Sequence, residues 1–144
     1  MLVEERDIET ITPYDNNPRD NDAGVDAVAA SMQAFGVRQP VVVDEDGVVI
    51  VGHTRLKAAK KLGYKTIAVH VATGLTPAQA KAYRIADNQT ANLSNWDFDK
   101  LPLELMALQN EGFNLDLTGF SADELLKLLD DGPKDGLTDP DDIP

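Results

Sequence analysis

Apolar residues recur at helical spacing in the first third of the chain. The recurring positions are Val25, Val28, Ala29, Met32 and Phe35. With Gly36 as a stop signal, the pattern predicts an amphipathic helix over about residues 23–35. Upstream, the short apolar stretch from Ile8 to Ile11 predicts a strand. The segment that follows this strand is rich in Pro, Asn and Asp, which is typical of an ordered loop.

Two runs of β-branched residues come next. Residues 41–43 and 48–51 are separated by the acidic turn Asp44–Gly47, a pattern that predicts a β-hairpin with a solvated tip. The second run leads directly into Gly52. Helical spacing then returns, so we expect a helix over residues 53–62.

The remaining elements are predicted from alternation and from helix start signals. Over residues 66–71, Ile67, Val69 and Val71 fall on one face, which predicts a third strand. Thr76 to Gln79 form a capping box with proline at the first helical position, which predicts a helix to about Asn88. Further helices are expected over residues 98–110 and, after a second capping box at Ser121, to Leu129. The chain is therefore predicted to be a small α/β (α+β) protein.

Composition places the 144 residues in a globular class with an uneven distribution of charge. The net charge is −12, yet residues 37–91 carry eight basic and four acidic side chains between two acidic flanks. The basic middle allows local binding of polyphosphate, although the chain as a whole would not be attracted strongly to duplex DNA. There is no cysteine, which excludes disulfides and cysteine nucleophiles and fits a cytoplasmic protein.

Composition also suggests how the chain is divided. We predict a domain over residues 1–95, a helical extension over residues 96–130, and an acidic flexible linker or tail over residues 131–144. No apolar run approaches the roughly 18 residues that a membrane span needs, so no membrane partner is expected.

Residues 48–55 place a strand, a glycine and a helix start in direct succession, an arrangement that often holds phosphate. The first turn of a helix has unpaired N–H groups and a partial positive charge, and Gly52 has no Cβ to obstruct an anion. In that turn Arg55 can donate two parallel hydrogen bonds, His53 a third, and Thr54 a hydroxyl. The alternative is an ordinary helix start that is capped by Thr54 and has Arg55 in solvent.

Three motifs in a fixed order carry a resemblance to a known family. They are Asn17-Pro18-Arg19, Gly36 to Val43, and Gly52 to Ala59 with Leu62-Gly63. Over about residues 6–95 this order resembles the N-terminal domain of ParB-type partition proteins, whose fold is shared with sulfiredoxin. The resemblance implies a small mixed sheet with flanking helices, followed here by short C-terminal helices. It also implies that Gly52 to Arg55 hold the phosphates of a nucleoside triphosphate, CTP or ATP, with or without Mg²⁺.

Departures from the family pattern affect the predicted chemistry. ParB proteins have glutamate and arginine where this chain has His53 and Thr54, and the missing glutamate argues against hydrolysis of CTP. A second family motif contains Glu-Asn followed by an arginine. Of this motif the chain retains only the acid and the amide, as Asp87-Asn88. Asp87 is a candidate to hold a metal or a ribose, or to make a local hydrogen bond, and it is the one weak candidate for catalysis. Sulfiredoxin chemistry is excluded because its catalytic cysteine has no counterpart.

Other side chains are candidates for contact with the nucleotide. Arg19 lies in the loop that approaches the nucleotide in the family, and Asn88 is a second candidate contact. Arg38 and Gln39 precede the first core strand and could contact base or sugar. With two histidines far apart in sequence, a structural zinc site is not expected.

The His-containing turn, together with Asp87-Asn88-Gln89 and Asn95-Trp96-Asp97, resembles the ParB-like domains at the front of phage and prophage DNA-modification methylases. The resemblance implies a nucleotide-binding domain that meets DNA through the full-length protein, with a methyltransferase domain downstream. Two alternatives remain open at this point. One is a metal-dependent nuclease or phosphotransferase, and the other is a non-enzymatic protein-interaction module.

Overall fold

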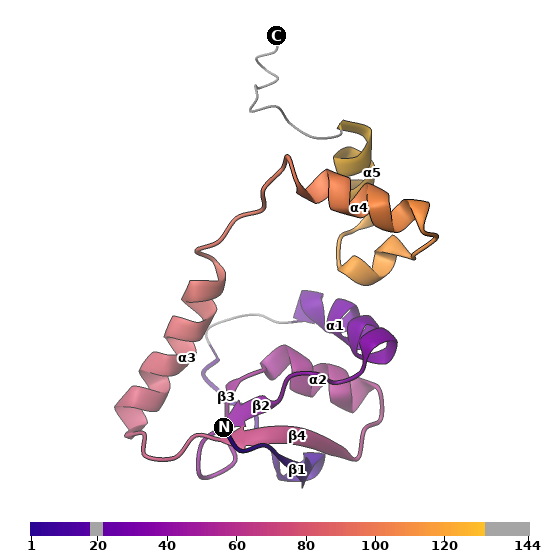
Figure 1. Ribbon diagram of the computed structural model, residues 1–144. Coiled ribbons are helices and arrows are strands. Elements are labelled where there is room, and N and C mark those ends of the chain that lie inside the picture. Colours follow the sequence, from indigo (N-terminus) through magenta and orange to yellow (C-terminus); the bar gives the residue numbers. More distant parts are fainter. Residues whose placement is uncertain (18–21, 132–144) are drawn as a thin grey trace. The chain divides into compact units, whose positions relative to one another are not determined.

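The computed structural model describes residues 1–17 and 22–131, and it divides the chain into two compact units, Met1–Leu93 and Ser94–Pro144 (Figure 1). Two predictions lie outside the described residues. They are the placement of Arg19 and the flexible tail after residue 131. Each unit has its own buried apolar cluster, and each is described separately below.

The first unit has a mixed four-stranded sheet, as the fold class predicted. Its elements in order are β1 (Glu4–Asp7), the 3-10 helix η1 (Ile8–Thr10), α1 (Asp22–Phe35), β2 (Val41–Val43), β3 (Val49–Val51), α2 (His53–Lys61), β4 (Thr66–Val71) and α3 (Pro77–Ala91). The strand order is β1-β4-β2-β3. β2 runs parallel to β4, whereas the β1–β4 and β2–β3 pairs are antiparallel. The predicted hairpin and the predicted strand at residues 66–71 are confirmed.

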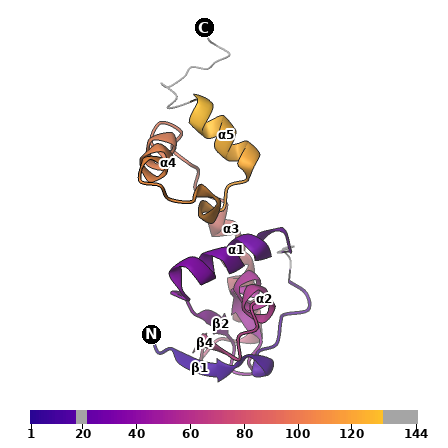
Figure 2. The same cartoon turned by 90° about the vertical axis from the view of Figure 1, so that its right-hand side faces the viewer.

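Helices α1 and α2 pack against each other on the same side of the sheet, and α3 runs beside β3 (Figures 1 and 2). The inward residues of the central strands are fully buried, with Val41, Val43 and Val69 at 0% exposure. Ala29 and Met32 of α1 complete this cluster from the helical side. The apolar stripe that predicted the first helix is therefore the face that packs on the core.

The predicted strand at Ile8 to Ile11 is wrong. Residues 8–10 form η1, capped by Asp7, whose side chain accepts a hydrogen bond from the backbone N–H of Glu9 (2.9 Å). The strand lies just before it, over Glu4–Asp7, and pairs with β4. Its side chains are nearly all charged and exposed, so its stability comes from backbone pairing at a sheet edge, which an apolar pattern does not reveal.

The second unit contains α4 (Leu101–Asn110), the 3-10 helix η2 (Leu115–Thr118) and α5 (Ala122–Asp131). Leu105, Leu115 and Leu125 form its buried cluster. The ring centre of Trp96 lies 5.4 Å from that of Phe120 in this same unit. Across the described ranges, no helix is long and apolar enough to cross a bilayer.

Gly52 is required by the fold itself. Its φ is +107°, and a Cβ added there would lie 3.2 Å from Cγ2 of Val41 on β2. Gly63, which follows the same helix, has a φ of +80° with nothing within 4 Å of an added Cβ. The two glycines thus share the left-handed backbone but differ in available space.

We therefore expect Gly52→Ala to destabilise the protein more than Gly63→Ala does. A side chain in the left-handed region costs about 1–2 kcal/mol in both variants, and only Gly52→Ala adds a steric conflict with the core. Urea unfolding of the two variants measures the difference. Equal losses of unfolding free energy would show that the contact with Val41 relaxes without cost.

Candidate phosphate-binding turn and adjoining cavity

The turn at residues 52–55 joins the end of β3 to the start of α2. The first helical hydrogen bond runs from the N–H of Leu56 to the carbonyl of Gly52 (2.9 Å). The N–H groups of residues 53–55 therefore precede the helical ladder, and no side chain caps them. The alternative in which Thr54 is the N-cap is wrong, because Gly52 holds that position and Thr54 lies inside the helix.

Arg55 lies half-buried in this first turn. Burial lowers the pKa of its guanidinium below the ordinary value, which indicates that part of its hydration is lost. Within the described part of the chain, no carboxylate lies within ion-pair distance of Arg55. A partly desolvated cation beside unpaired N–H groups is a favourable environment for an anion.

His53 is placed differently from a free phosphate donor. Its side chain is only 9% exposed, and its Nε2 accepts a hydrogen bond from the backbone N–H of Tyr14 (3.2 Å). An imidazole that accepts through Nε2 is neutral and carries its proton on Nδ1. Burial lowers the pKa of His53, and the positive charges of Arg84 and Lys57 lower it further. A side-chain contact from His53 to phosphate would therefore have to come from Nδ1.

Arg84 of α3 is the main residue that the sequence analysis missed. It is 5% exposed, its Nε donates to the carbonyl of Val49 (2.9 Å), and its guanidinium lies 3.9 Å from the centre of the Tyr14 ring. One of its terminal nitrogens is 3.6 Å from Oδ2 of Asp44. The sequence offered one weak signal, which is that Arg84 follows the apolar Ala80 by four residues and so shares its helix face.

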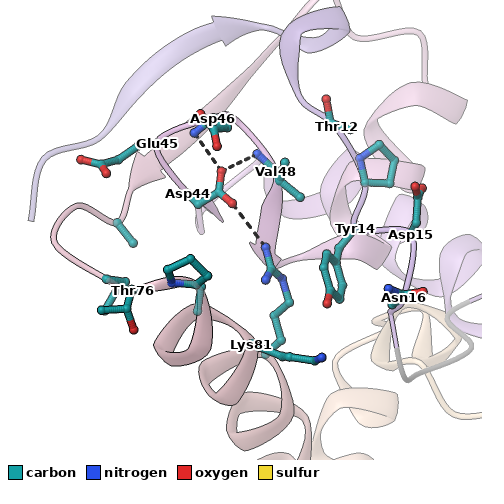
Figure 3. Close-up of a pocket in the computed structure, with 16 residues that line it drawn as sticks. Thr12, Tyr14, Asp15, Asn16, Asp44, Glu45, Asp46, Val48, Thr76 and Lys81 are labelled. Carbon is teal, nitrogen blue, oxygen red and sulfur yellow. Dashed lines mark hydrogen bonds and ion pairs between the residues drawn. The ribbon is translucent and has the colours of Figure 1, made fainter.

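A cavity of about 720 Å³ adjoins this cluster (Figure 3). Three segments line it: residues 12–16, the hairpin turn from Asp44 to Val48, and residues 72–84 around the start of α3. Asp44, predicted to be part of a solvated tip, accepts through Oδ1 from the N–H groups of Asp46 (2.9 Å) and Val48 (3.0 Å) while it faces Arg84. The ion pair and the backbone bonds fix the shape of the turn at the cavity's edge.

For three of the other predicted contacts, the described residues show local hydrogen bonds. Nδ2 of Asn88 donates to the carbonyl of Arg84 (3.0 Å), one turn earlier on α3. The backbone carbonyl of Asp87 accepts from Thr90 Oγ1 (3.1 Å). Nε of Arg38 donates to the carbonyl of Phe35 (2.8 Å), and Gln39 is exposed beside it. Among the described residues, no group of three or more His, Cys, Asp or Glu side chains could hold a metal ion.

Comparison with known proteins assigns the family. The model of the ParB N-terminal domain matches residues 2–89, and that of the ParB-methyltransferase HTH domain matches residues 99–144. The chain belongs to the ParB N-terminal domain family. The sequence had predicted helices within residues 98–129 but not this match to a helix-turn-helix domain, because those helices lack the basic face that usually indicates DNA recognition.

Individual relatives agree with this assignment. The ParB-like nuclease domain-containing protein YnaK of Escherichia coli K12 is 36% identical over 75 residues, which cover 51% of this chain and 86% of that protein. C-terminally truncated ParB from Caulobacter crescentus aligns with a TM-score of 0.72 at 19% identity, over 90% of this chain and 77% of that one. A pNOB8-like ParB-N domain aligns with a TM-score of 0.53 at 21% identity, over 76% and 49%. The two structures establish a ParB-type fold.

The environment of His53 leads to a pH-dependent stability. Because the folded-state pKa of His53 lies below its unfolded value of 6.5, the unfolded chain binds more protons in that interval. The stabilisation is complete above about pH 6.5 and is lost as the pH falls through the folded pKa, at up to about 1.4 kcal/mol per pH unit. Urea unfolding between pH 7.5 and 5 should show this loss in the wild type.

His53→Gln keeps an acceptor for Tyr14 and does not titrate, so its loss of stability over this range should be smaller. His70→Gln, which removes the other histidine, is the matched control and should retain the dependence that arises from His53. Parallel pH profiles for the wild type and His53→Gln would contradict the assignment.

Proposed function

We propose that the first unit binds the phosphates of a nucleoside triphosphate at the Gly52–Arg55 turn. The observation that carries this proposal is the half-buried guanidinium of Arg55, which has no carboxylate partner in the described residues and lies in a helix turn with unpaired N–H groups. A bound phosphate would accept from these N–H groups and from Arg55 together. It would replace the hydration that the guanidinium loses on folding.

The charge of α2 supports an anionic ligand. Besides Arg55, the helix carries Lys57, Lys60 and Lys61, and it has no acidic side chain. The methyl group of Thr54 faces α1, where a Cβ added at Gly24 would lie 3.7 Å from Thr54 Cγ2. In the proposal Thr54 contributes its N–H and its hydroxyl, while His53 contributes its N–H and supports the turn through Tyr14.

The identity of the nucleotide is suggested by a relative. Caulobacter crescentus ParB was solved in complex with CTP-γ-S, so CTP is the first nucleotide to test, followed by ATP. Asn88, Arg19, Arg38 and Gln39 are proposed as contacts to the rest of the nucleotide, and Mg²⁺ as an ion that travels with its phosphates. Asp87 is proposed as a ligand of that ion or of the ribose.

The same proposal extends to the full-length protein. The second unit matches a helix-turn-helix domain of ParB-methyltransferases, yet residues 94–131 carry nine acidic and two basic side chains. Duplex DNA would be repelled by that surface. We therefore propose that this unit connects the nucleotide-binding unit to a methyltransferase of the phage DNA-modification type, which supplies the contact with DNA. Bound nucleotide would order the first turn of α2 and the flanking loops, and so bias that contact.

Isothermal titration of CTP, ATP and GTP, with and without Mg²⁺, tests the phosphate site. We expect one nucleotide to bind, and Arg55→Gln to weaken its affinity by about tenfold or more, because a charge-assisted hydrogen bond is worth roughly 1.5–3 kcal/mol. Lys60→Gln is the matched control, since it removes the same charge from an exposed position in the last turn of the same helix. Its effect should be about threefold or less.

Comparison of the two variants distinguishes a specific phosphate site from general electrostatic attraction of the nucleotide to α2. Equal weakening by Arg55→Gln and Lys60→Gln would mean that the nucleotide responds only to the charge of α2. Absence of binding by the wild type at millimolar nucleotide would refute the proposal for this chain. Hydrogen exchange at residues 52–60 is a second readout, and unchanged protection with saturating nucleotide would contradict ordering of the turn.

A further inference from the structure

The cavity beside Arg84 has a chemistry that the proposed phosphate site does not use. Its rim carries the exposed carboxylates of Asp15, Glu45 and Asp46. The pair formed by Asp44 and Arg84 neutralises itself, which leaves Lys81 as the one cation opposite three anions among the lining residues. This edge is therefore net negative, although residues 37–91 as a whole are net positive.

The lining between these charges is apolar. Leu75 is 36% exposed at the start of α3, and Pro13, Val48, Ala72 and Pro77 lie along the same wall. Lys and Arg side chains combine an aliphatic stem with a charged head, and they lay the stem along apolar surface while the head meets a carboxylate. A cavity of about 720 Å³ has room for several residues of an extended peptide.

Three independent contacts hold the walls in place before any ligand binds. Thr12 is bonded on both sides to the start of β3, through its N–H to the carbonyl of Gly47 and through its carbonyl to the N–H of Val49 (both 2.9 Å). The capping box of α3 fixes Thr76 and Gln79. Arg84 joins the hairpin turn to the loop at Tyr14. A preformed groove lowers the ordering cost of binding a peptide.

We propose that this cavity is a docking site for an extended basic segment of a protein partner. Lys or Arg heads pair with Glu45, Asp46 and Asp15, which are labelled in Figure 3. Their stems lie on Leu75 and Pro77. The site lies on α3 and the hairpin turn, and its carboxylates and apolar wall are separate from the residues of the proposed phosphate site.

The test uses the full chain labelled with ¹⁵N and the blocked peptide acetyl-Arg-Ala-Arg-Ala-Arg-amide as the probe, in 150 mM salt to screen diffuse attraction. We expect amide shifts concentrated at Glu45, Asp46, Ala72 and Leu75. The double variant Glu45→Gln with Asp46→Asn should weaken the affinity by about fivefold, which corresponds to two partly screened ion pairs. Leu75→Ser should weaken binding without a change in charge.

The matched control is Glu5→Gln with Glu9→Gln, which removes the same charge from exposed residues of β1 and η1 that do not line the cavity. It should leave the affinity within twofold of the wild type. Equal weakening in both double variants, or shifts spread over the acidic surface of both units, would overturn the proposal in favour of diffuse attraction. Absence of binding would overturn it outright. None of these outcomes depends on whether Arg55 holds phosphate.

Discussion

The guanidinium of Arg84 enters the interior of the first unit and meets three different segments there. Its charge is balanced by Asp44, one of its N–H groups is bonded to Val49, and its face lies on the ring of Tyr14. A buried guanidinium with no such partners would cost several kcal/mol, so the segments that supply them are stabilised together. Because they belong to the hairpin turn, to β3 and to the loop before α1, one side chain of α3 fixes their mutual positions.

The candidate phosphate turn depends on the same arrangement. β3 begins at Val49, which Arg84 holds, and ends one residue before Gly52. On the other side of the turn, His53 accepts the N–H of Tyr14, whose ring Arg84 also contacts. The first residue of α2 is thus fixed through both its backbone and its side chain. Anchoring this first residue limits the ordering that a bound anion must bring about in the rest of the turn, and a smaller ordering cost favours a selective phosphate site.

Local signals in the sequence were sufficient for most of this fold. The capping box at Thr76 predicted α3 because both of its hydrogen bonds form within one helical turn. The acidic turn after Val43 likewise predicted the hairpin. What could not be predicted depends on long-range partners. His53 resembled a donor because its partner Tyr14 is 39 positions away. Arg84 was not singled out because Asp44 and Val49 meet it only in the folded chain. The charged edge strand Glu4–Asp7 was missed because it contributes pairing rather than an apolar pattern.

The proposed phosphate site and the loop at Tyr14 are thermodynamically linked through His53. Two of the causes that lower the pKa of His53 are positive charges, those of Arg84 and Lys57. A polyphosphate bound at the turn would oppose these charges and make protonation of His53 less costly. A protonated imidazole cannot accept from the N–H of Tyr14, so the loop that forms one wall of the cavity would lose an anchor. The coupling is reciprocal. A ligand that stabilises the Tyr14 loop while His53 is neutral would lower the affinity of the turn for anions. One neutral histidine thus lies between the proposed anion site and the loop that lines the acidic cavity.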